Sequence, residues 1–277
     1  MTNKIFNIKE DYKHIKIKFL CFKLNIKKNI KINLDDLQCY HLASQVNKNL
    51  KKYQGVFTNK NIVIVGGGPT LKYYNNPIKN VINIGINRAF MLNHIDFDYL
   101  FIQDKLPLKE ERDNFINYRP DECIKFIGRH PFYWDRIIRN DFISHIKNKE
   151  TYILNNRRPN NCIHPIDISV EPFMRYNATV FSILQFLQYA NARKIYLVGF
   201  DCSVGHMFAK MKFEQDQRQQ YKYWKMFKEY KDNYWEDVEI ISVNPAGLKG
   251  MFRDVYTQSY INDHKYLLNQ TIEILND

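Results

Sequence analysis

The sequence predicts an α/β protein with a Rossmann-like, doubly wound and mainly parallel sheet of about seven strands. Three observations predict this fold. From residue 61 onward, short apolar runs alternate with amphipathic stretches of helix length. The runs are rich in β-branched residues and apolar throughout, which is typical of strands buried on both faces. The first run leads directly into three glycines, a proline and a threonine, the order of a strand, a glycine loop and a helix start.

Each expected element follows from its local pattern. Strands are expected at 62–65, 81–86, 99–103, 123–127, 152–154, 195–198 and 238–243. Helices are expected where apolar residues recur every three or four positions, at 135–147, 178–189 and 213–235. In such sheets ligands bind beyond the carboxyl ends of the strands. Functional residues are therefore expected in the loops that follow the strands.

Length and composition narrow the class of protein. A chain of 277 residues with 45% hydrophobic residues can bury a sizeable core. No apolar run is long enough to span a bilayer, and no secretory signal opens the chain. The five cysteines are scattered and form no C-x-x-C pair. We therefore expect a reduced, cytoplasmic protein.

The positive charge is concentrated near the N-terminus. Residues 1–60 hold thirteen lysines and four acidic residues, a formal charge of +9 out of +12 for the chain. We expect residues 1–55 to form a basic arm, with short strands at 14–33 and a helix at 34–53, and residues 56–277 to form the main domain. A basic arm favours an anionic partner, such as the inner face of the cytoplasmic membrane. A solvated lysine-rich edge is the alternative.

The loop after the first expected strand is predicted to hold the phosphate and sugar of a nucleotide-linked ligand. Glycines let the main chain approach a ligand closely, and the N–H groups of the next helix point at an anion. The spacing excludes a Walker A loop and the dinucleotide fingerprint, whose third glycine is replaced by Leu71. A tight turn without a ligand is the alternative. The predicted ligand-binding residues of this loop are Gly66, Gly67, Gly68, Pro69 and Thr70.

Polar residues also follow the second and third expected strands. Asn87 comes after the second strand, and Gln103 and Asp104 come after the third. An amide can donate and accept, which suits a ribose or a base edge. We expect these residues to face the same ligand, although each taken singly could be an ordinary loop cap.

Three segments together resemble one known family. They read VIVGGGPTLK (63–72), RYNATVFSILQFLQYANARKIYLVGFDCS (175–203) and IISVNPAGLKG (240–250). In order and spacing they resemble the bacterial sialyltransferases of the Campylobacter type, over roughly residues 60–255. The resemblance implies a single nucleotide-binding domain with a lid, a CMP-sialic acid donor, no cofactor and no metal.

The resemblance also assigns roles to residues. The glycine loop would lie along the donor phosphate and sugar, and Asn87 and Gln103 would face the ribose and the transferred sugar. The remaining expected donor-binding residues are Arg175, Asn177, Ala178, Thr179, Asp201 and Ser203. As alternatives, Arg175 is an ordinary surface cation and Thr179 a helix cap.

The sequence departs from the family after the G-x-D motif. The family has tyrosines there to hold the leaving phosphate, and a catalytic histidine further along, but residues 207–263 contain no histidine. His206 is therefore the candidate base, with an ordinary loop histidine as the alternative. Lys210 and Lys212 are expected to stabilise the departing phosphate. Residues 205–222 are expected to form the lid.

These observations predict a metal-independent glycosyltransferase. It would move a sialic acid-like sugar from a CMP-linked or other nucleotide donor to a bacterial cell-surface glycan, as in lipopolysaccharide or capsule synthesis. Three alternatives remain: a transferase of another nucleotide-activated group, a relative that keeps the pocket but has lost the base, and a non-catalytic protein that binds nucleotide or nucleic acid. Nucleic acid is disfavoured because the basic arm is separate from the glycine loop. The oligomeric state stays open.

Overall fold

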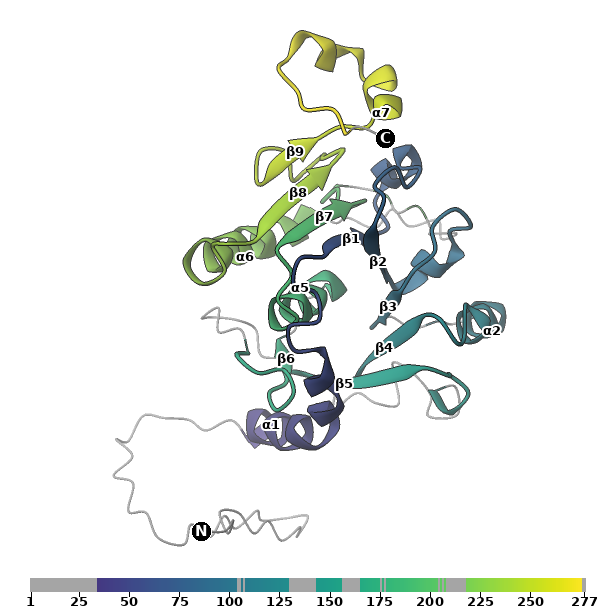
Figure 1. Cartoon of the computed structure of the whole chain (residues 1–277), viewed down its shortest axis with the longest axis vertical. Helices are drawn as coiled ribbons and strands as arrows, with labels where there is room; N and C mark the ends of the chain where they lie inside the picture. Colours follow the sequence, from purple (N-terminus) through teal and green to yellow (C-terminus); the bar gives the residue numbers. More distant parts are fainter. Residues whose placement is uncertain are drawn as a thin grey trace, which may run out of the picture. The chain divides into compact units, whose positions relative to one another are not determined.

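A computed structural model describes most of the main domain. The described residues are 34–103, 106, 108–129, 143–155, 165–174, 176, 178–203, 205, 207 and 218–275. The chain divides into two compact units, Met1–Leu34 and Asp35–Asp277. The second unit holds the sheet (Figure 1).

The described residues form one nine-stranded sheet in which every neighbouring pair is parallel. Its spatial order is β6-β5-β4-β3-β2-β1-β7-β8-β9. The strands are β1 (Asn61–Val65), β2 (Val81–Ile86), β3 (Tyr99–Ile102), β4 (Ile124–Arg129), β5 (Lys149–Asn155), β6 (Phe173–Met174), β7 (Lys194–Val198), β8 (Glu239–Val243) and β9 (Arg253–Val255).

The strand order reverses between β1 and β7. From β1 the chain moves outward, strand by strand, to β6. It then returns to place β7 on the other side of β1 and continues outward to β9. At such a reversal the loops after the two central strands diverge to opposite faces of the sheet and leave a crevice between them.

Helices cover both faces of the sheet, with α5 and α6 on one side and α2 on the other (Figure 1). Within the described residues, none of the helices combines the length and apolar character needed to cross a bilayer. The α-helices are α1 (Leu34–Val46), α2 (Lys109–Asn117), α5 (Thr179–Tyr189), α6 (Tyr221–Tyr234) and α7 (Gln258–Asp263). Short 3₁₀ helices are η1 (Asn47–Tyr53), η2 (Pro69–Tyr73), η3 (Asn87–Met91), η4 (Arg218–Gln220) and η5 (Lys265–Asn269).

The core is divided by the sheet into two apolar layers. Under α5 the layer is rich in aromatic rings: Phe101 and Phe126 stack with centroids 4.4 Å apart, and Phe186 of α5 lies 4.8 Å from Phe126. Phe115, the buried residue of α2, packs into the opposite layer. Burial on both faces explains why the central strands are apolar at every position.

The predicted fold class is confirmed, and all seven predicted strands are present with ends that differ by no more than three residues from the expected ones. The expected strand number is too low by two. The additional strands β6 and β9 have two and three residues and lie at the two edges of the sheet. Runs this short carry no readable periodicity.

The predicted helix at 34–53 is an α-helix only as far as Val46 and continues as the 3₁₀ helix η1. The change occurs at Asn47, which is fully buried. Its amide donates to the carbonyl oxygens of Ile168 and Glu171, at 3.0 and 2.9 Å, and accepts from the backbone N–H of Ile153 at 2.9 Å. Because these contacts tie the helix to the sheet, residues 35–55 belong to the main unit, whereas the sequence suggested a boundary at residue 55.

Several predicted segments lie outside the described residues. These are the short strands at 14–33, most of the predicted helix at 135–147 and most of the predicted lid at 205–222. The predicted helix at 213–235 is observed from Tyr221 as α6, preceded by η4. The predicted helix at 178–189 is confirmed as α5.

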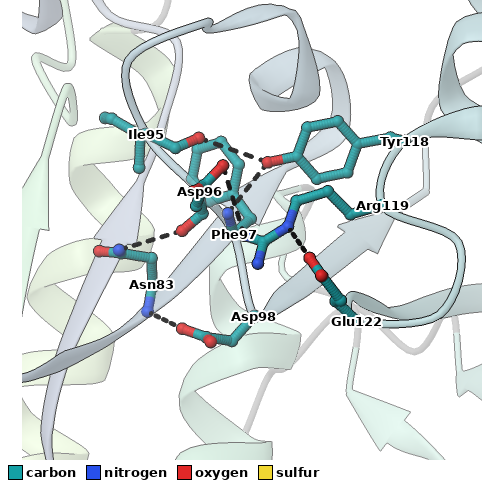
Figure 2. A network of polar contacts seen from close by, with 8 residues as sticks. All are labelled: Asn83, Ile95, Asp96, Phe97, Asp98, Tyr118, Arg119 and Glu122. Atoms are coloured by element: carbon teal, nitrogen blue, oxygen red, sulfur yellow. Dashed lines mark hydrogen bonds and ion pairs between the residues drawn. The ribbon is translucent and has the colours of Figure 1, made fainter.

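A network of polar contacts fixes the amino-terminal edge of the sheet, opposite the carboxyl ends of the strands (Figure 2). The backbone N–H of Asn83 donates to Asp98 Oδ2 at 2.8 Å, and the Asn83 amide donates to the Asp96 carbonyl at 3.1 Å. Arg119 Nη1 lies 3.4 Å from Asp96 Oδ1, and Arg119 Nε lies 2.6 Å from Glu122 Oε2. These contacts connect the loops that precede β3 and β4.

Tyr118 is the central residue of this network, and its removal is expected to weaken the fold without affecting the opposite edge. Its hydroxyl accepts from the Phe97 N–H at 3.0 Å and donates to the Ile95 carbonyl at 3.3 Å. Tyr118→Phe leaves both backbone groups without this partner and is expected to cost about 1–2 kcal/mol in urea unfolding. The exposed Tyr234 is the matched control, because Tyr234→Phe should change nothing. Equal stability of the two variants would contradict this assignment.

Candidate functional site

A cleft lies at the reversal of strand order between β1 and β7. It has a volume of about 180 Å³. The glycine loop after β1, Asn87 after β2, residues 199–203 after β7 and residues 178–180 at the start of α5 all line it. Four segments that are distant in sequence therefore meet where a doubly wound sheet binds its ligands.

The glycine loop and the β7 loop pack directly against each other. Gly66 N–H donates to the Val198 carbonyl and Gly68 N–H to the Gly199 carbonyl, both at 2.8 Å. A Cβ on Gly66 would lie 2.6 Å from the Gly199 carbonyl oxygen, and one on Gly68 would lie 2.7 Å from the same atom. Two of the three glycines are therefore needed for contact between loops. The sequence had attributed their lack of side chains to a ligand.

Asp201 connects the two loops through its side chain. Asp201 is buried, with 4% of its surface exposed. Asp201 Oδ2 accepts the Thr70 N–H at 2.7 Å, and Oδ1 accepts the Thr70 hydroxyl. Burial raises the pKa of the Asp201 carboxyl, while the two Thr70 hydrogen bonds oppose that rise because they stabilise the anion. Thr70 was expected to contact a ligand, but its hydroxyl binds Asp201.

The N-terminus of α5 opens onto the cleft. Its N-cap residue Ala178 is extended, with φ −149° and ψ 139°, and caps no N–H group through its side chain. The first turn contains no acidic residue. The first N–H groups of a helix have no partner within the helix and carry partial positive charge. Because Ala178, Thr179 and Val180 line the cleft, this end of α5 faces any ligand bound there.

The side chain of Gln103 points away from the cleft, whereas Asn87 lines it. Asn87 lines the cleft in a left-handed conformation, φ 50°, which asparagine tolerates better than most residues. Its Oδ1 accepts the Gln103 N–H at 3.1 Å. The Gln103 side chain points into the core, where its amide donates to Tyr152 Oη and Ser182 Oγ, both at 2.8 Å. Gln103 therefore supports the cleft wall from behind and does not line the cleft.

The remaining predicted site residues divide into three groups. Ser203 lines the cleft, together with Asp201, Ala178 and Thr179. Pro69 begins η2 and does not line it. The predicted residues that lie outside the described part of the chain are Asp104, Arg175, Asn177, His206, Lys210 and Lys212.

Sequence reasoning missed several residues of the cleft. Phe200 and Trp224 line it with ring centroids 5.8 Å apart, and Gln220 and Cys202 line it as well. Burial raises the pKa of the Cys202 thiol to about 12, so this thiol stays protonated at neutral pH. Trp224 resembles an ordinary core residue of an amphipathic helix, and only the tertiary structure brings it to the cleft. Among the described residues, no cluster of three or more His, Cys, Asp or Glu side chains is arranged to hold a metal ion.

Comparison with known proteins yields two solved structures of low similarity. No protein-family model matches the sequence, and no curated protein sequence matches it. The structure of the MAf glycosyltransferase from Magnetospirillum magneticum AMB-1 aligns over 79% of this chain with a TM-score of 0.46 and 11% identity. The chain spans 38% of the length of that protein. Monomeric CstII aligns over 66% of this chain and 80% of its own, with a TM-score of 0.36 and 12% identity.

Proposed function

We infer that the protein is a glycosyltransferase whose nucleotide-sugar donor binds in the β1/β7 cleft. The observation that carries this proposal is the position of the cleft at the reversal of strand order. Three loops that follow strands and the start of α5 converge there, as expected for a nucleotide site in a doubly wound sheet.

The groups around the cleft suit an anionic ligand with neutral hydroxyls. The N–H groups at the start of α5 would attract a phosphate or a carboxylate. The amide of Asn87 and the hydroxyl of Ser203 supply donors and acceptors for a ribose or a sugar. The rings of Phe200 and Trp224 offer an apolar wall for a base.

We further propose the details that the sequence suggested. The donor is CMP-linked and carries a sialic acid-like sugar, and the reaction needs no metal and no other cofactor. An acceptor hydroxyl of a surface glycan attacks the anomeric carbon, His206 takes its proton, and the nucleotide phosphate departs near Lys210 and Lys212. The basic N-terminal arm brings the enzyme to the inner face of the cytoplasmic membrane.

A thermal-shift panel of CMP, UDP, GDP, ADP and NAD tests the proposal. A ligand at about 100 times its Kd adds about 2.7 kcal/mol of stability, so one nucleotide should raise the Tm clearly. Stabilisation by CMP that EDTA does not alter supports the proposed donor. If only another nucleotide stabilises the protein, the proposed nucleotide site would stand, but the donor would not be CMP-linked. No response to any nucleotide, with retention on heparin, would instead favour a nucleic-acid-binding protein.

The variant Ala178→Asp is expected to raise the stability of the protein and at the same time to abolish nucleotide binding. A carboxylate at this N-cap would accept hydrogen bonds from N–H groups in the first turn of α5 and raise stability by up to about 1 kcal/mol. The same negative charge would occupy the expected anion position, so the response to nucleotide should be lost. Leu108→Asp is the control, since Leu108 is the uncapped N-cap of α2 and does not line the cleft. Both variants should be stable, and only Leu108→Asp should respond to nucleotide.

A further inference from the structure

Asp201 lies where three loops meet, two of which line the cleft. Its carboxylate holds Thr70, at the start of η2 after β1. Its backbone carbonyl accepts the N–H of Gly247, in the loop after β8, at 2.6 Å. Asp201 itself follows β7. One residue thus connects the loops that follow β1, β7 and β8, the three strands at and beside the reversal of order.

Two glycines make room for Asp201. A Cβ on Gly68 would lie 2.6 Å from Asp201 Oδ2, and a Cβ on Gly247 would lie 2.6 Å from the Asp201 carbonyl oxygen. Both distances are far below van der Waals contact. The neighbouring chain therefore approaches Asp201 closely from two sides, Gly68 at its carboxylate and Gly247 at its backbone carbonyl.

A carboxylate is the best match for this pair of donors. Thr70 offers two donors, the backbone N–H and the hydroxyl, and Asp201 offers a separate oxygen to each. An amide in the same place has one acceptor oxygen, so its NH₂ group fits only if the Thr70 hydroxyl turns to accept, and both hydrogen bonds lose the charge of the carboxylate. Since the residue is 4% exposed, water cannot easily compensate for the lost contact.

We propose that Asp201 is a positioning residue: although it lines the cleft, its two carboxylate oxygens are occupied by Thr70, and it acts by fastening the glycine loop and the β8 loop to the β7 loop, which preorganises the main chain that lines the cleft. The inference depends on the proposed function, because it assigns the cleft to a nucleotide. It replaces the direct donor contact that the sequence suggested for Asp201 and Thr70. Preorganised groups bind more tightly because they lose less freedom when the ligand arrives.

Three variants test the proposal through CMP affinity, measured by isothermal titration. Asp201→Asn and Thr70→Val each remove one side of the contact, and each should weaken CMP binding about tenfold. The double variant should bind CMP no more weakly than Asp201→Asn alone, because the hydroxyl contact that Thr70→Val removes is one of the two contacts that Asp201→Asn alters. Thr70→Ser keeps the hydroxyl and should restore affinity to within about threefold. Tyr118→Phe, which lowers stability at the opposite edge, is the control for destabilisation alone and should leave the affinity unchanged.

Hydrogen exchange keeps the test independent of the proposed function. Amide exchange in residues 66–71 and 246–248 should accelerate in Asp201→Asn and Thr70→Val even without ligand. If the wild type binds no nucleotide but exchange accelerates, the proposed function fails and the role of Asp201 in holding the loops stands. Unchanged exchange, or CMP affinity that survives Asp201→Asn within twofold, would overturn the inference. Loss of CMP binding in Asp201→Asn while amide exchange in residues 66–71 stays unchanged would show that Asp201 contacts the nucleotide directly, which also overturns the inference.

Discussion

A Gly68→Ala protein is expected to be less stable than the wild type by about 3 kcal/mol and to lose its response to nucleotide. Gly68 has φ −70° and ψ 157°, a conformation open to any residue, so the whole cost is steric. The added methyl group would lie 2.6 Å from Asp201 Oδ2 and 2.7 Å from the Gly199 carbonyl oxygen. Relief of this clash requires the loops after β1 and β7 to separate, which breaks the contact of Asp201 with Thr70.

The matched control is Gly250→Ala. Gly250 has φ +74°, which is unfavourable for alanine, but nothing lies within 4 Å of a Cβ there. The Gly250→Ala variant should lose about 1 kcal/mol of stability through the backbone conformation alone, and it should keep the response to nucleotide. Urea unfolding measures the stability of both variants, and titration with CMP measures binding. A Gly68→Ala protein as stable as Gly250→Ala would mean that the two loops yield easily and are not tightly packed.

The central strands could be predicted because their environment leaves a clear pattern. Residues 62–65 of β1 are all buried, so every position is apolar and the run is easily recognised. The edge strands β6 and β9 could not be predicted, since they are two and three residues long. Helix α2 was missed for a related reason. Phe115 is its single buried residue, so no apolar stripe repeats along it.

The place of the cleft could be predicted, but the contacts within it could not. Loops at the carboxyl ends of parallel strands meet at one edge, and the glycine loop, Asn87 and Ser203 do line one cleft. That β1 pairs with β7 is a tertiary fact that no local pattern encodes. Without it, nothing in the sequence indicates that Asp201 turns toward Thr70.

The orientation of the Gln103 side chain, which points into the core, could not be predicted from the sequence either. Its amide is satisfied by Tyr152 on β5 and Ser182 on α5, residues 49 and 79 positions away. A polar residue after a strand looks the same in sequence whether it faces a ligand or closes a buried network. The choice depends on which partners the fold brings near, and here two hydroxyl groups lie within 2.8 Å.

Lys125→Met is expected to stabilise the protein, by about 1–3 kcal/mol near neutral pH. Lys125 lies on β4 with its side chain fully buried, and its Nζ has no hydrogen-bond partner among the described residues. Burial lowers the pKa of this amine from its ordinary value of 10.5, although Cys123 and Asp121 oppose the shift. Methionine fills a similar volume without a polar group, so the cost of burying the amine disappears.

Lys149 provides the control, because it is the cross-strand neighbour of Lys125 on β5. Its Nζ donates to the Ile143 carbonyl at 2.6 Å, so Lys149→Met removes a contact and should be neutral or destabilising. The pH dependence gives a second check. With a lowered pKa in the folded state, the unfolded chain binds more protons between that pKa and 10.5, and wild-type stability therefore rises with pH through this window. The advantage of Lys125→Met in urea unfolding should accordingly be largest near about pH 7 and shrink toward about pH 10. A difference that stays constant over this range would mean that the Lys125 amine keeps its proton in the folded protein, with a partner of its own.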